Sequence, residues 1–185
     1  MAGHSKWAQI KRQKAVTDAA KSRTFSKFAR EITLESKKSA GNLSSPALSA
    51  VIARAKAVNM PKDNIERAVA KGTSKESQAL EQVVYELYGP SGIAVVATAV
   101  TDNKNRTTQE IKILLSKNGY ALGGIGSAAW AFTKTPDGRY LPNEPRMEVA
   151  GDNEEKLQEL LTILDEQDDT QEIFTNAINY ESTGD

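Results

Sequence analysis

The sequence contains no cysteine, one histidine and no long apolar run. The absence of cysteine excludes disulfide bridges, thiolate zinc sites and cysteine nucleophiles, and it is typical of proteins in a reducing compartment. The longest apolar run, residues 93–100, has the length of a buried strand and is too short to cross a bilayer. Residues 1–7 lack the apolar core of an export signal. These features predict a cytoplasmic protein without a membrane partner.

Sequence patterns typical of catalytic sites or metal sites are also scarce. The only histidine, His4, lies in a polar arm, where we expect it to be solvated rather than held against catalytic or metal partners. The acidic run DEQDD at 165–169 lacks the spacing of a calcium loop and predicts a solvated turn. GGIGS at 123–127 matches no phosphate-loop pattern and predicts a bend, although its backbone N–H groups could bind a phosphate oxygen. We therefore expect no enzyme activity, no metal site, no cofactor and no small-molecule substrate.

Charge is divided unevenly along the chain, although the net charge is zero. Residues 1–75 hold 16 Lys and Arg against 5 Asp and Glu, a net charge of +11, whereas residues 76–185 hold 8 against 19, a net charge of −11. This segregation predicts a polyanionic partner for the first part. The acidic part either reduces non-specific binding or folds back on the basic part, and the sequence does not separate these two effects.

Hydrophobic periodicity predicts two domains, a basic helical domain at 1–75 and an α/β domain at 80–185. The first begins with an irregular or mobile arm at 1–17 and continues as a three-helix bundle. Its helices are expected at 18–40, 46–58 and 61–72, where caps and glycines mark their ends.

The second domain alternates strands and helices. Strands are expected at 82–88, 93–100, 128–134, 147–149 and 172–178, and helices at 102–117 and 153–166. This order is one extra strand followed by β-α-β-β-α-β, a split βαβ pattern typical of ferredoxin-like folds. The predicted fold class is therefore α+β.

Candidate nucleic-acid-binding residues are concentrated in the basic arm and on the first long helix, whose cations fall opposite its apolar stripe. Trp7 either stacks on an unpaired base or packs on the bundle. In TDNKNRT at 101–107, Lys104 and Arg106 either contact a phosphate or stand beside simple capping by Asp102. The full set of candidates is Lys6, Trp7, Lys11, Arg12, Lys14, Lys21, Arg23, Lys27, Arg30, Lys37, Lys38, Lys104 and Arg106.

Several blocks of the sequence resemble the YebC/PmpR family, in the order in which that family has them. The blocks are GHSKW at 3–7, FSKFAREI at 25–32, NMPKDNIERAVAKG at 59–72, YELYGPSGIAVV at 85–96, TDNKNRT at 101–107 and GYALGGIGSAAWAF at 119–132. The resemblance implies a cytoplasmic, non-enzymatic, nucleic-acid-binding regulator of gene expression. The basic residues at matching positions are Lys6, Lys11, Lys14, Lys27, Arg30 and Arg106. The usual member resembles a three-domain protein, and residues 133–152 leave room only for a short connection where the third, inserted domain would lie.

Three functions are compatible with these features. The first is a translation factor that binds RNA or the ribosome, which the basic arm, Trp7 and the absence of a base-reading helix favour. The second is a DNA-binding transcriptional regulator that uses the same cations, as the family's naming suggests. The third is a protein-interaction module whose basic part docks onto an acidic protein or onto its own C-terminal domain. All nucleic-acid hypotheses depend on the cations facing outward, free of neighbouring carboxylates.

Overall fold

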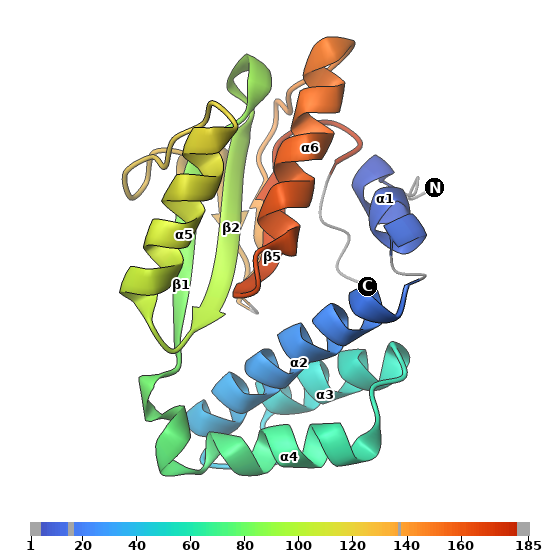
Figure 1. The fold of residues 1–185 in the computed structure, drawn as a ribbon, viewed down its shortest axis with the longest axis vertical. Coiled ribbons are helices and arrows are strands. Elements are labelled where there is room, and N and C mark those ends of the chain that lie inside the picture. The colour runs from blue at the N-terminus through green and yellow to red at the C-terminus, as the bar shows by residue number, and fades with distance from the viewer. Residues whose placement is uncertain (1–4, 15–16, 137, 181–185) are drawn as a thin grey trace.

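A computed structural model describes residues 5–14, 17–136 and 138–180 of the chain, so His4 lies outside the described residues. Helices and strands both form, and the α+β class predicted from the sequence is confirmed. Figure 1 shows a layer of helices below an α/β unit in which further helices lie in front of a sheet. No helix of the described residues is long and apolar enough to span a membrane.

The three helices of the lower layer match the predicted bundle. They are α2 (Asp18–Lys38), α3 (Pro46–Ala57) and α4 (Lys62–Gly72). Their shared core contains the fully buried Ile32 of α2 and Leu48 of α3. Helix α4 lies very close to α2 at Gly72, where an added Cβ would stand 2.5 Å from the Cβ of Ser36. Glycine at this position allows the two backbones to approach.

The N-terminal arm differs from its prediction, because residues Lys6–Lys14 form a helix, α1. Figure 1 shows α1 beside the α/β unit rather than within the bundle. Trp7 is only 3% exposed and belongs to the core of the α/β unit. Both expectations for Trp7 are therefore wrong, because it neither stacks on a base nor packs on the bundle. The large apolar surface of an indole stabilises the fold most when it is buried.

The α/β unit is built on an antiparallel sheet with the strand order β1-β2-β5. Its strands are β1 (Glu81–Tyr88), β2 (Ala94–Thr101) and β5 (Thr170–Thr175). Two helices, α5 (Lys104–Lys117) and α6 (Asp152–Glu166), contribute leucines and isoleucine to the core on one face of the sheet. Strand β2 is buried along its whole length, as its continuous apolar run predicted.

The predicted ferredoxin-like strand order does not form. Strands β3 (Phe132–Lys134) and β4 (Tyr140–Pro142) pair only with each other, and residues 147–149 contribute a single bridge, from Met147 to Ala177. The β3–β4 hairpin packs on a face of the sheet instead of extending it. The ring centroid of Tyr140 in this hairpin lies 5.4 Å from the ring centroid of Phe174.

Candidate nucleic-acid interface

The acidic residues 165–169 connect α6 to β5 and lie against α2; we call them the acidic turn. The Nζ atom of Lys27 is 2.9 Å from Oδ1 of Asp165 and donates a hydrogen bond to its carbonyl oxygen at 2.8 Å. Lys11 of α1 lies 3.4 Å from the same carboxylate. The prediction of a solvated turn is therefore wrong, because this segment folds back onto the basic part of the chain.

The Lys27–Asp165 pair is shielded from solvent, with side-chain exposures of 18% and 26%. Burial lowers the pKa of Lys27, and the attraction of Asp165 offsets this only in part. Burial by itself raises the pKa of Asp165, but the ammonium groups of Lys11 and Lys27 outweigh it and hold that pKa below its ordinary value. The carboxylate is thus charged at neutral pH, and the contact is an ion pair.

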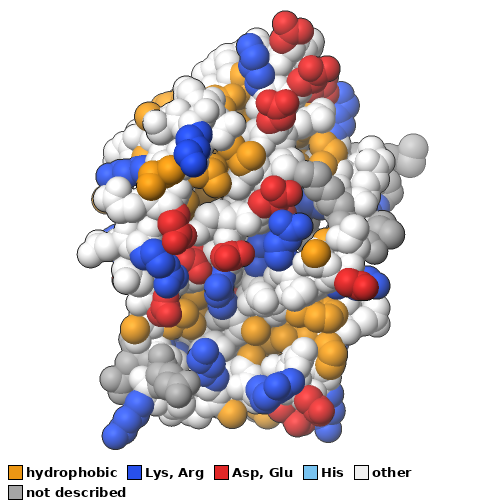
Figure 2. Space-filling view, viewed as in Figure 1, with side chains coloured by type: hydrophobic (Ala, Val, Ile, Leu, Met, Phe, Trp, Pro, Cys, Tyr) orange, Lys and Arg blue, Asp and Glu red, His pale blue; other side chains and the backbone are white. Residues whose placement is uncertain are grey.

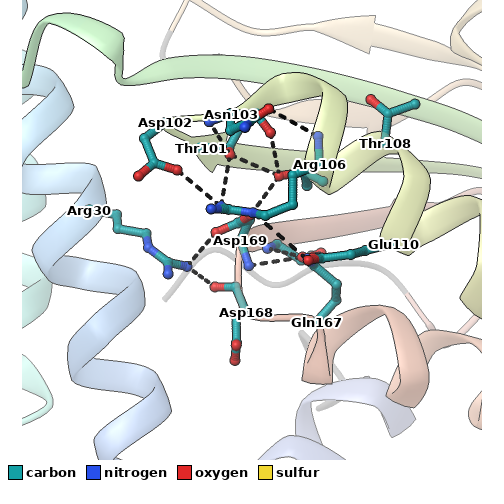
Figure 3. A network of polar contacts seen from close by, with 12 residues as sticks. Arg30, Thr101, Asp102, Asn103, Arg106, Thr108, Glu110, Gln167, Asp168 and Asp169 are labelled. Carbon is teal, nitrogen blue, oxygen red and sulfur yellow. Dashed lines mark hydrogen bonds and ion pairs between the residues drawn. The ribbon is translucent and has the colours of Figure 1, made fainter.

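A second contact centres on the carboxylate of Asp169, whose side chain is 4% exposed (Figure 3). Its Oδ1 lies 3.0 Å from Nη1 of Arg30 on α2, and that guanidinium also donates to the carbonyl oxygen of Asp168. Its Oδ2 accepts hydrogen bonds from Arg106 at 3.0 Å and from Thr107 at 2.6 Å, both on α5. One buried carboxylate therefore joins the bundle to the α/β unit and orients an arginine from each.

Many of the predicted binding cations are neutralised by acidic side chains. Ion pairs involve Lys6, Lys11, Arg23, Lys27, Arg30, Lys38 and Arg106. Figure 2 shows Lys and Arg side chains interspersed with Asp and Glu on the face in view. The prediction of one free cationic face on α2 is therefore wrong, and nucleic-acid binding can no longer be argued from the cations of α2 alone. The sequence left open whether the acidic part folds back, and the structure places it on α2.

The remaining predicted binding residues differ in their surroundings. Lys21 and Lys104 are exposed, and neither forms an ion pair with a described residue. Arg12 is also exposed, and Lys37 donates a hydrogen bond to the carbonyl oxygen of Leu80 at 3.1 Å. The side chain of Lys14 lies outside what the structure describes.

A groove of about 840 Å³ runs between α2, α4 and the start of α5. We call it the α2–α4 groove. The half-buried ring of Phe25 contributes to its lining. Its charged residues are the cations Lys21, Arg30, Arg67, Lys71 and Arg106 and the carboxylates Asp18, Asp102 and Asp169. Cations are in excess, and Asp169 is buried beneath two of them.

Three of the groove residues were missed from the sequence. Asn64, Arg67 and Lys71 lie on α4, and all three contribute to the groove. Their spacing of i, i+3 and i+7 places them on one helical face. That spacing is visible in the sequence, but only the apolar residues of this helix were assigned a role, in the core of the bundle. Nothing in the sequence showed that this face would oppose Lys21 of α2.

The start of α5 is capped by a different residue from the one predicted. Oδ1 of Asn103 accepts a hydrogen bond from the backbone N–H of Arg106 at 3.1 Å. Asp102 instead forms an ion pair with the Arg106 guanidinium at 3.0 Å. The first turn of α5 thus presents exposed Lys104 beside a paired arginine.

Across the described part of the chain, no three acidic or histidine side chains gather as metal ligands.

The glycine-rich segment at 123–127 forms turns, and its N–H groups already have an anionic partner. The carboxylate of Glu86 accepts hydrogen bonds from the N–H groups of Gly126 at 2.7 Å, Ala128 at 2.8 Å and Ala129 at 2.7 Å. Burial by itself raises the pKa of Glu86, but these three hydrogen bonds outweigh it and lower that pKa. The carboxylate occupies the place that a phosphate oxygen would need.

Comparisons with known proteins agree with the resemblance noted in the sequence. Residues 5–75 match the family model described as the TACO1/YebC protein N-terminal domain. Residues 80–137 match the model described as the TACO1/YebC second and third domain. A conserved hypothetical protein from Aquifex aeolicus has a similar crystal structure, with a TM-score of 0.82 and 28% identity. That alignment covers 94% of this chain and 96% of the other.

Two relatives carry the name "probable transcriptional regulatory protein". The one from Fervidobacterium nodosum is 47% identical over 136 residues, which are 72% of this chain and 54% of the relative. The one from Petrotoga mobilis is 42% identical over 189 residues, covering 97% of this chain and 72% of the relative. The match thus spans about half the length of the first relative. Both matches and both family models lead to the same conclusion: the chain belongs to the TACO1/YebC family.

Proposed function

We propose that the chain is a non-enzymatic regulator of gene expression that binds a single-stranded segment of RNA in the α2–α4 groove. The observation that carries this proposal is the convergence of five cations from three helices on one concavity, although Arg30 and Arg106 are paired with carboxylates there. Neutralisation of phosphates by such cations releases counterions and drives binding. A single-stranded binding site typically combines a cationic groove with aromatic side chains, and Phe25 supplies the aromatic surface here.

The shape of the site favours a single strand over a duplex. Sequence-specific duplex DNA binding commonly inserts a protruding helix into the major groove, whereas the cations here line a concave surface. Lys21, Arg67 and Lys71 are exposed, and none forms an ion pair with a described residue. They can therefore contact phosphates without first breaking a salt bridge.

Duplex DNA is the second candidate partner. The names of the relatives, which describe probable transcriptional regulation, support a regulator and favour DNA. The same cations would then contact the two strands of the duplex from the rim of the groove. Only residues 143–151 connect β4 to α6, and we propose that the two described units suffice for binding without an inserted third domain.

Fluorescence anisotropy separates the two candidates. The probes are a 20-nucleotide single-stranded RNA, the matching single-stranded DNA and the matching duplex. We expect the RNA to bind most tightly and the double variant K21E/R67E to weaken its binding at least tenfold, because it places two carboxylates in the groove. The control K112E/K117E makes the same charge change at exposed positions of α5 outside the groove. Equal losses for the two variants would contradict the groove assignment.

A translational role is tested by sedimentation with ribosomes at moderate salt. We expect the wild-type chain to enter the ribosomal fractions and K21E/R67E to remain in the supernatant. A wild-type chain that never enters these fractions, but protects a defined duplex DNA site in footprinting, would replace the RNA proposal with the DNA one. Sequence-independent retardation of duplex DNA that disappears with added salt would count against a transcriptional role.

A further inference from the structure

The contact between the bundle and the α/β unit consists largely of charged groups. The core of the bundle and the core of the sheet are separate apolar clusters in the described residues. Across the contact, Lys27 and Arg30 pair with the acidic turn, and Arg54 of α3 lies 3.3 Å from Glu172 of β5. Interfaces that are polar rather than apolar allow units to move relative to each other.

The connectivity of the chain is compatible with such a movement. Helix α1 is held in the α/β core by Trp7, and the 3₁₀ turn Lys75–Ala79 leads from α4 directly into β1. The bundle α2–α4 is therefore connected at both ends to the α/β unit. A movement of the bundle would leave α1 packed against the sheet, because Trp7 belongs to the core of the α/β unit.

The cations beneath the acidic turn form a regular stripe. Arg23, Lys27 and Arg30 follow one another at i, i+4 and i+7 on α2, and Lys11 of α1 lies next to them at Asp165. Guanidinium and ammonium groups bind carboxylates and phosphates through the same charge-assisted hydrogen bonds. The stripe thus suits a sugar–phosphate backbone as well as it suits the acidic turn.

We propose that the acidic turn occupies a second nucleic-acid surface, formed by Lys11, Arg23, Lys27 and Arg30, and that a nucleic-acid backbone displaces it. The proposal rests on the proposed function, because it assumes that the chain binds nucleic acid. Arg30 belongs to both surfaces, since it lines the groove and pairs with Asp169. A strand held in the groove therefore reaches the edge of the covered stripe, and the acidic turn weakens binding by competing for it.

The competition has a measurable size. While the turn covers the stripe, the apparent affinity for nucleic acid equals the intrinsic affinity multiplied by the fraction of molecules in the open arrangement. Asp165 and Glu166 contribute two carboxylates to the contact, and neither is fully buried. Weakening two such ion pairs shifts the equilibrium by about fivefold, given the modest strength of partly exposed pairs. Asp169 is left unchanged in the variant because Arg106 and Thr107 hold it in the α/β unit, so that displacement breaks only its pair with Arg30.

The test compares D165N/E166Q with E155Q/E159Q, which removes the same two charges from exposed positions of α6. The probe is the 20-nucleotide single-stranded RNA. We expect D165N/E166Q to bind about fivefold more tightly than wild type and E155Q/E159Q to bind less than twofold more tightly. Equal gains for the two variants would reduce the acidic turn to a long-range charge effect and overturn the proposal.

A second measurement follows the movement itself. The chain contains no cysteine, so the substitutions A50C on α3 and S116C on α5 allow two dyes to be attached, one to each unit. We expect energy transfer between the dyes to change when the RNA binds and to differ already in free D165N/E166Q. Binding with unchanged energy transfer would overturn displacement of the turn.

The outcomes also separate this proposal from the groove proposal. If K21E/R67E abolishes RNA binding while the acidic-turn variant behaves like its control, the groove stands and the covered stripe fails. If K21E/R67E has no effect while D165N/E166Q binds more tightly, the groove fails and the stripe is the main surface.

Discussion

Removing three cations from the α2–α4 groove should change how salt affects RNA binding. The triple variant K21A/R67A/K71A removes the three groove cations that are exposed and form no ion pair with a described residue. If each contacts one phosphate, the number of neutralised phosphates falls by three. For a single strand, the slope of log K against log salt is about −0.7 per phosphate, so the slope should become about 2 units shallower.

This change is large enough to measure by anisotropy titration. Between 50 and 200 mM salt, the wild-type chain should lose about 20-fold more affinity than the triple variant does. The effect should be the same for oligouridine and for a mixed sequence, because phosphate contacts carry no base information.

The matched control is K112A/K117A/K156A, which removes three exposed lysines of α5 and α6 that do not line the groove. We expect its salt slope to stay within about half a unit of the wild-type value, because these lysines contact no phosphate in the proposed complex. Equal slopes for the two triple variants would refute the groove as the site of phosphate contact. A change that appears for only one RNA sequence would refute the assignment of these cations to the backbone.

Three further predictions concern residues outside the groove cations. W7A should lower the free energy of unfolding by about 3–5 kcal/mol in urea titrations and leave RNA affinity nearly unchanged, since Trp7 is buried; weaker RNA binding at unchanged stability would restore the stacking role. E86Q should cost about 2–4 kcal/mol at pH 7, because it leaves N–H donors of the glycine-rich turn without a full acceptor. Folding lowers the pKa of Glu86, so its carboxylate stabilises the fold fully above the pKa that it has in the unfolded chain. This stabilisation is lost as the pH falls below about 4, and the loss of unfolding free energy caused by E86Q should shrink over the same range. A loss that does not depend on pH would contradict this. G72A should cost about 1–3 kcal/mol, because its Cβ would collide with Ser36, whereas G124A, which meets nothing within 4 Å, should be much milder.

The helices of the bundle were predictable because their signals are local. Pro46 begins α3, as expected of proline in a first turn, and α2 and α4 end within two residues of their predicted limits. The apolar spacing of α2 also identified Ile32 as a core residue, and it is fully buried. In contrast, α1 was missed because its apolar residues pack against a unit that follows some 70 residues later in the chain.

The strand order was less predictable than the strands themselves. Periodicity placed β1, β2 and β5 almost correctly, but it contains no information on which strands become neighbours. The extra strand β1 took the place beside β2 that the ferredoxin-like order assigns to a later strand. The short β3 and β4 were left to pair as a hairpin on the face of the sheet.

The sequence by itself determined the family, the α+β class and the division of charge between the two parts of the chain. Only the tertiary structure decided which charges are available, because Lys27 and Asp165 are 138 residues apart and meet only when the two units pack together. Coulomb attraction between exposed groups depends on distance and burial, and neither can be read from composition. The groove was decided in the same way, since Arg67 of α4 and Lys21 of α2 become neighbours only through the packing of two helices.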